Sequence, residues 1–137
     1  MKYVLLLFTF WLSFLLAIDF FETPIRFSTK QLTMHQAVRI GRDVFKQLLR
    51  LEFLLLSIAL FQGFRLQSSF ILEAVLILGV LLVVQQFYLL PILDQRAERL
   101  LAVVELTPSW HHAAYIVVEL GKCALLGSLV IKITKNL

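Results

Sequence analysis

The chain has few charged residues, few glycines and almost no cysteine, and each shortage excludes a class of protein. Only 16 % of its 137 residues are charged, whereas soluble domains carry about 25 %. Five glycines leave no Gly-rich phosphate loop, and neither a nucleophile elbow nor a His-Glu-x-x-His helix occurs. The single Cys123 excludes an intrachain disulfide and a paired-cysteine metal or redox site. We therefore lean against an enzyme and against a soluble protein.

Apolar residues are correspondingly abundant. They make up 60 % of the chain, and the mean hydropathy is +0.87. Part of the surface must then face something other than water, which predicts an integral membrane protein embedded in the lipid bilayer. The 13 Lys and Arg residues exceed the nine Asp and Glu residues. Because the basic residues gather between apolar stretches, we expect them to meet anionic lipid, and we expect no nucleic-acid partner.

Four apolar segments predict an all-α, polytopic membrane protein, an antiparallel bundle of four transmembrane helices in one domain, 1–137. The helices are expected at about residues 3–21, 33–64, 68–90 and 109–133. Segment 92–106 mixes charged and apolar residues, which is typical of a short interfacial helix. The first segment resembles a signal-peptide core. Because it lacks a small-x-small cleavage site, we interpret it as an uncleaved helix.

Two prolines and a capping box mark expected helix ends. Pro24 and Pro91 should end the first and third helices, because proline lacks the N–H that continues a helix. Thr33 with Gln36 matches a capping box at the start of the second helix. From there to Phe64 a continuous helix would extend about 48 Å, whereas the hydrocarbon core is about 30 Å thick. Its first part should therefore project from the membrane or lie at its surface.

Basic residues also predict the orientation. Most Lys and Arg residues lie in the connections after the first and third helices, and such residues stay cytoplasmic. Both termini should then lie outside the cytoplasm of a bacterial inner membrane. Four basic residues at helical spacing form what we call the basic face, and we expect it to contact anionic lipid or a protein partner. They are Arg39, Arg42, Lys46 and Arg50.

An offset of 67 residues recurs along the chain. The matching residues are Phe20 and Phe87, Pro24 and Pro91, Ile25 and Ile92, and Glu52 and Glu119. Two tandem helical hairpins, related by an axis along the membrane normal, would produce this pattern. Chance identity in a chain rich in Leu and Phe is the alternative.

Charged residues within the fourth segment are the most informative feature. Glu119 and Lys122 lie about 14 and 18 Å from Trp110 along a helix, near the bilayer midplane. A charge there costs about 2.5–3.5 kcal/mol if it is left unpaired, so both side chains should face inward. His112 and Tyr115 share the same helix face. We call these four residues the polar stripe.

The polar stripe has two interpretations. It is either a site that binds or passes a proton, a metal cation or another small polar species, or an interhelical clamp. In the clamp, Lys122 pairs with Glu52 or Glu73. Because one lysine faces three buried carboxyl groups and burial disfavours the charged form, at least one carboxyl group should hold a proton at neutral pH.

A metal site built from His112, Glu52 and Asp19 is a further open alternative, because imidazole and carboxylate groups bind transition metals. No residue spacing specifies it. A haem is not expected, because the remaining histidine, His35, lies about 25 Å before Glu52 along the second helix. We predict no other cofactor.

A set of scattered residues resembles a known family. The set is Phe20, Phe21, Ala37, Arg42, Phe45, Pro91, His112, Tyr115 and Lys122. With these residues the chain resembles the small four-helix membrane proteins related to transmembrane protein 205. The resemblance implies the four-helix architecture. It implies no catalytic or binding residue.

Three functions remain as hypotheses. The leading one is a non-enzymatic membrane protein that binds or passes a small polar or cationic species, such as a proton or a metal cation, through the polar stripe. The alternative is an accessory or scaffold subunit, or a homo-oligomer, that recruits a partner or anionic lipid through the basic face. The third is a cofactor-dependent membrane enzyme.

Overall fold

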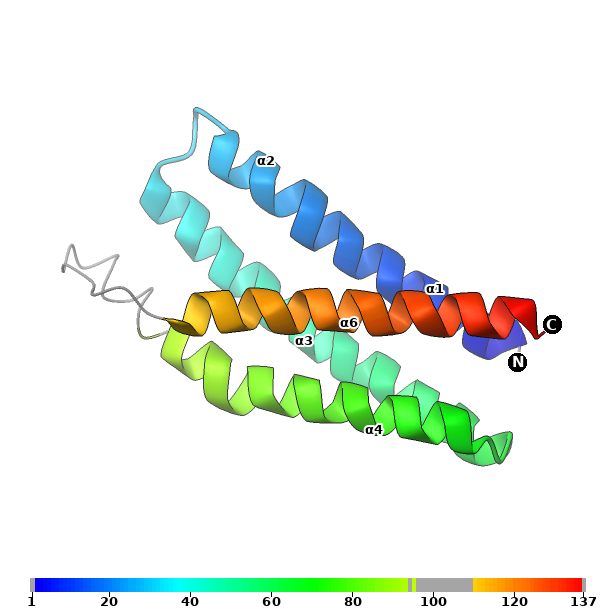
Figure 1. Ribbon diagram of the computed structural model, residues 1–137. Coiled ribbons are helices and arrows are strands. Elements are labelled where there is room, and N and C mark those ends of the chain that lie inside the picture. Colours follow the sequence, from blue (N-terminus) through cyan, green and yellow to red (C-terminus); the bar gives the residue numbers. More distant parts are fainter. Residues whose placement is uncertain (1, 94, 96–109, 137) are drawn as a thin grey trace.

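The computed structural model describes residues 2–93, 95 and 110–136, and over this range the regular elements are all helical. They form four long rods (Figure 1). The first rod, Lys2–Ser28, joins α1 (Lys2–Leu16), the π-helix η1 (Ala17–Glu22) and α2 (Thr23–Ser28). The second is α3 (Met34–Arg65). The third, Ser69–Leu93, contains α4 (Ser69–Val84) and the π-helix η2 (Gln85–Leu89). The fourth is α6 (Trp110–Lys135). The all-α prediction is confirmed.

Neither proline ends a helix, so the predicted ends at Phe21 and Leu90 are wrong. The wide π turn of η1 lets the Thr23 N–H reach the carbonyl of Ile18, and the Thr23 hydroxyl donates to the same oxygen at 2.9 Å. Pro24 then falls in the first turn of α2, where a missing N–H costs nothing. Pro91 follows η2 in the same way, and the third rod continues to Leu93.

The start of α3 agrees with the predicted capping box. The Gln36 N–H donates to Thr33 Oγ1 at 3.1 Å, and the Thr33 N–H donates to Gln36 Oε1 at 3.0 Å. At its other end a tight turn leads into α4. Gln67 has a φ of 50°, and Ser68 caps α4 by accepting a hydrogen bond from the Ile71 N–H at 3.3 Å.

The four rods share one hydrophobic core. Successive rods run antiparallel, and the two termini lie at the same end of the molecule (Figure 1). The most extensive packing joins α3 to α4 and α1 to α6. Buried apolar side chains from every rod meet in this core, among them Phe8, Leu49, Leu78 and Leu126. The core therefore holds all four rods together.

Two helices within the described residues are long and apolar enough to cross a membrane, namely Lys2–Ser28 and Ser69–Leu93. The interfacial helix predicted over 92–106 lies outside the described residues, apart from positions 92, 93 and 95.

Candidate functional site

A buried ion pair lies between α3 and α6. The Nζ of Lys122 donates to both oxygens of Glu52, at 2.8 and 2.9 Å. The same ammonium group lies 2.8 Å from Oε1 of Glu119, one turn away on α6. Lys122 and Glu52 are fully buried, and Glu119 is 6 % exposed. The three N–H bonds of the ammonium group are therefore all used by carboxylate oxygens.

Side chains from the other two rods complete this ion pair. The indole Nε1 of Trp11, in α1, donates to Oε2 of Glu52 at 3.0 Å. The amide Nε2 of Gln85, the first residue of η2, donates to Oε1 of Glu119 at 2.8 Å. Trp11 and Gln85 are fully buried. Every rod thus contributes a polar side chain to one connected group.

A third carboxyl group, that of Asp19, lies next to this ion pair. Its side chain, in η1, lies beside that of Glu119. Asp19 Oδ2 and Glu119 Oε2 are both buried and accept no hydrogen bond from a nitrogen or hydroxyl group of the described residues. Ionised carboxylates only accept hydrogen bonds, so a bond between two carboxyl groups requires a proton on one of them. A proton on one of these two carboxyl groups would let it donate to the other.

We call Trp11, Asp19, Glu52, Gln85, Glu119 and Lys122 the ionic network. It has one ammonium group for three carboxyl groups, so it carries one net negative charge when Asp19 and Glu119 share one proton. Gln85 Oε1 and the hydroxyl of the nearby Tyr115 are also buried without a hydrogen-bond partner among the described residues. A buried polar atom left unpaired costs about 1–3 kcal/mol. Three acceptor oxygens of the network, Asp19 Oδ2, Gln85 Oε1 and Glu119 Oε2, thus lack a donor among the described residues, while the Tyr115 hydroxyl can donate or accept.

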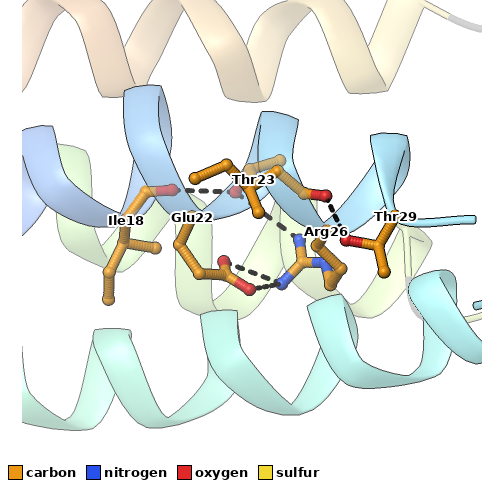
Figure 2. Close-up of polar contacts among 6 residues, drawn as sticks. Ile18, Glu22, Thr23, Arg26 and Thr29 are labelled. Atoms are coloured by element: carbon orange, nitrogen blue, oxygen red, sulfur yellow. Dashed lines mark hydrogen bonds and ion pairs between the residues drawn. The ribbon is translucent and has the colours of Figure 1, made fainter. Parts of the chain in front are cut away.

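A second polar group lies on the first rod, after Asp19 in the sequence (Figure 2). The buried Arg26 donates through Nη1 to both carboxylate oxygens of Glu22, at 2.8 and 2.9 Å. Its Nη2 lies 3.5 Å from the hydroxyl of Thr23. The guanidinium group packs against Gly41 of α3, where an added Cβ would come within 2.9 Å of Nη2. The missing side chain of Gly41 thus makes room for Arg26.

The structure brings together three of the predicted site residues and separates one. Glu52, Glu119 and Lys122 meet as described, with Tyr115 one turn away from Glu119 on α6. Glu73 is exposed in the second turn of α4, so its predicted role as a partner of Lys122 is wrong. The side chain of His112 lies outside the described part of the structure.

The described residues provide no ligand set for the alternative metal site. Among the side chains that the structure describes, no group of three or more His, Cys, Asp and Glu residues is arranged to hold a metal ion. Asp19 and Glu52 instead belong to the ionic network, each beside Glu119 or Lys122.

The basic face occupies the first half of α3. Arg39 and Arg50 are exposed, whereas Arg42 and Lys46 are half-buried. It shares no residue with the ionic network, so the two features can be tested separately.

Sequence reasoning missed Trp11, Gln85 and Arg26. Trp11 is uncharged and stands in an apolar segment, although its N–H requires a partner wherever the ring is buried. Gln85 and Gln86 are the polar residues in an otherwise apolar stretch, which was a usable signal. Glu22 and Arg26 stand at i and i+4, the spacing of an ion pair on one helix face.

Comparison with known families, with curated proteins and with solved structures finds no match for this chain. The resemblance to proteins related to transmembrane protein 205 therefore stays a prediction.

Proposed function

We propose that this chain is a membrane protein with four transmembrane helices that binds and exchanges a proton at the Asp19–Glu119 carboxyl pair. The observation that carries the proposal is the proximity of these two carboxyl groups, the half-buried Asp19 and the buried Glu119, beside the ammonium group of Lys122. Intramembrane ionisable groups commonly belong to proton or ion pathways.

Exposed apolar surface supports a membrane location. In the two apolar helices, only 22 % and 33 % of the most hydrophobic window is buried, whereas a core helix of a soluble protein would be mostly buried. Large apolar side chains are exposed on every rod. Examples are Leu6, Phe61, Leu76 and Val117, which are 60–69 % exposed. So much exposed apolar surface suits contact with lipid.

The two rods of lower hydropathy, α3 and α6, are also compatible with a membrane location. The charged residues that lower the hydropathy of α6 include Glu119 and Lys122, and these face Glu52 on α3. Paired and turned inward, such groups avoid most of the cost of a charge in lipid. The outward faces of both helices carry apolar residues such as Phe61 and Val117. A four-span bundle would therefore place the ionic network near the bilayer midplane.

Loss of the shared proton would leave two negative carboxylates in contact, because Lys122 is already occupied by Glu52 and Glu119. That arrangement is strongly unfavourable in a medium of low dielectric constant. The proton must then be exchanged for another proton or cation, or leave with a rearrangement. Glu22, Thr23 and Arg26 continue the polar face of Asp19 along the first rod. Glu22 is 40 % exposed and offers a route for the proton to reach the surface.

Infrared difference spectroscopy on the protein in lipid vesicles tests for the proton. A protonated carboxyl group has its own C=O band, which shifts in D₂O. We expect this band at neutral pH in the natural protein, and we expect Asp19→Asn to remove it. Glu73→Gln, which changes an exposed carboxyl group outside the network, should leave the band unchanged. A band that survives Asp19→Asn would place the proton elsewhere.

Proton exchange is tested in the same vesicles with a trapped pH-sensitive dye. After an external acid step, vesicles with the natural protein should acidify faster than empty vesicles, and vesicles with Asp19→Asn should not. If the infrared band is present but acidification matches that of empty vesicles, the proton is static and the network is a structural clamp.

We further propose the orientation that the basic residues predict, with both termini outside the cytoplasm of a bacterial inner membrane. Single cysteines at Ser28 and Asn136, each in a Cys123→Ser background, test it, because both positions are exposed. In intact cells an impermeant thiol reagent should label position 136 and spare position 28. The reverse pattern would invert the orientation.

The length of α3 favours the second candidate function, recruitment of anionic lipid or of a partner. Its 32 residues extend about 48 Å, which exceeds the hydrocarbon core of about 30 Å, and Arg39 is exposed near its start. A triple charge reversal at Arg39, Arg42 and Lys46 should misplace or invert the protein if this face meets anionic lipid. Correct insertion of that variant would mean that the basic face is only a solvated surface.

A further inference from the structure

We propose that the chain consists of two copies of one helical hairpin, and that their equivalent glutamates, Glu52 and Glu119, form one site for an ammonium-type cation, which the Nζ of Lys122 occupies here. The inference goes beyond the proton at Asp19, because it concerns the other side of Glu119 and does not require proton exchange.

Burial repeats at the 67-residue offset in the first helix of each hairpin. Four buried residues of α1 map onto four buried residues of α4. The pairs are Val4 and Ile71, Phe8 and Val75, Trp11 and Leu78, and Leu15 and Leu82, and all eight residues are at most 5 % exposed. The offset thus aligns the buried face of α1 with that of α4, which identity between Leu-rich segments does not by itself require.

Burial also repeats in the second helix of each hairpin. Four buried residues of α3 map onto four buried residues of α6, and all eight are at most 6 % exposed. The pairs are Leu48 and Tyr115, Glu52 and Glu119, Leu55 and Lys122, and Ala59 and Leu126. Equivalence thus extends to the ionic network itself.

The π-helices provide independent support. They occupy well under 1 % of residues in globular proteins, yet each hairpin contains one at the same place. Segment η1 ends at Glu22 and η2 ends at Leu89, which are again 67 residues apart. A proline follows each π-helix at the second residue, Pro24 and Pro91.

Packing between the rods has the same symmetry. When the two hairpins are exchanged, α6 takes the place of α3, and α1 takes the place of α4. The α3–α4 contact then becomes the α6–α1 contact, and these are the two most extensive contacts between rods. The hairpins are therefore related by an approximate twofold axis parallel to the rods. Glu52 and Glu119 lie beside this axis, because one Nζ is within 2.8 Å of an oxygen of each.

Lys122 breaks this symmetry, because its equivalent in the first hairpin is Leu55. The two equivalent glutamates define the position of its ammonium group. The lysine itself is not part of the repeated pattern. Three carboxylate oxygens surround the ammonium group, two from Glu52 and Oε1 from Glu119. Such a site suits a cation with several N–H donors.

Transfer of the lysine to its equivalent position tests the duplication. We compare the thermal unfolding midpoints, in detergent, of Lys122→Leu, of Lys122→Leu with Leu55→Lys, and of Lys122→Leu with Leu56→Lys. Leu56 is the matched control, because its Cδ2 lies 3.6 Å from the Cβ position of Gly79 and so points at α4.

The variant with Leu55→Lys should recover most of the midpoint lost in Lys122→Leu, and the control should recover none. If Lys122→Leu does not fold, size-exclusion chromatography replaces the unfolding midpoint. Lys122→Leu with Leu55→Lys should then fold, and Lys122→Leu with Leu56→Lys should not. Equal behaviour of the two double variants would overturn the equivalence.

Ammonium chloride tests the cation site in a Lys122→Ala variant. Its unfolding midpoint, or its folded yield if it does not fold unaided, should rise with added ammonium. Tetramethylammonium chloride at the same ionic strength should have no effect, because it has no N–H donor. The natural protein should respond to neither salt. A Lys122→Ala variant that ammonium leaves unchanged, folded or not, would overturn the cation site, whatever the infrared test of the Asp19 proton shows.

Discussion

Replacement of Lys122 by methionine should be among the most destabilising single changes in this protein. The ammonium group binds both oxygens of Glu52 and one oxygen of Glu119. Methionine keeps most of the side-chain volume but leaves Glu52, among the described residues, with only the Trp11 N–H as a donor. Removal of one partner from a buried ion pair costs about 3–5 kcal/mol, because the remaining charge is buried and uncompensated.

The double variant Lys122→Met with Glu52→Gln should regain most of this loss. It removes one positive and one negative charge, so the network keeps its single net negative charge, and the Asp19–Glu119 contact is untouched. Replacement of both members of a buried pair is often nearly neutral. Lys122→Met with Glu119→Gln should not recover in the same way, because Glu52, the residue with two bonds to Lys122, would stay charged.

Unfolding by denaturant in detergent, followed by circular dichroism, measures these differences. Lys132→Met is the control on the same helix. Lys132 lies 4.0 Å from the ring centre of Phe70 and is exposed, so its loss should cost no more than about 1 kcal/mol. A cost below about 1 kcal/mol for Lys122→Met, or the same cost for Lys122→Met with and without Glu52→Gln, would refute the buried pair as a determinant of stability.

Substitutions at four further positions have expected outcomes that the same unfolding assay checks. Gly63→Ala should destabilise by about 1–3 kcal/mol, because its Cβ would come within 3.2 Å of the buried Ile71. Gly121→Ala should instead stabilise by about 0.5–1 kcal/mol, because no atom of the described residues lies within 4 Å of the added Cβ. A reversed order would contradict this. Trp11→Phe should cost about 1–3 kcal/mol, because it leaves a carboxylate oxygen short of a donor, and an unchanged stability would argue against that bond. Thr33→Ala should cost about 0.5–2 kcal/mol through the lost cap, whereas Thr33→Ser should cost little.

Local signals along the chain were enough to predict several features of the site. Glu119 and Lys122 stand three residues apart in an apolar helix, and an unpaired charge in such surroundings is costly, so their inward direction and mutual contact followed from spacing alone. The capping box at Thr33 and Gln36 is likewise local, because both bonds form within one turn.

The helix ends at the prolines could not be predicted in this way. Pro24 removes one N–H, and from sequence that loss argues for a helix end. A π turn before it shifts the hydrogen-bond pattern by one residue, so the helix continues. No sequence signal that we used distinguishes a proline after a π turn from a proline that ends a helix.

By itself, the sequence determined the all-helical class, the apolar outer surface and the presence of charged residues that needed partners. Tertiary structure alone decided which partners they found. Glu52 and Glu73 are both lone acids in apolar stretches, yet the packing of α3 and α4 buries the first against Lys122 and exposes the second. Packing also brought Trp11 and Asp19 from the first rod, and Gln85 from the third rod, into the ionic network. Helical periodicity specifies which residues share a face, whereas the rotation of each rod about its axis depends on the fit of all four rods around their common core.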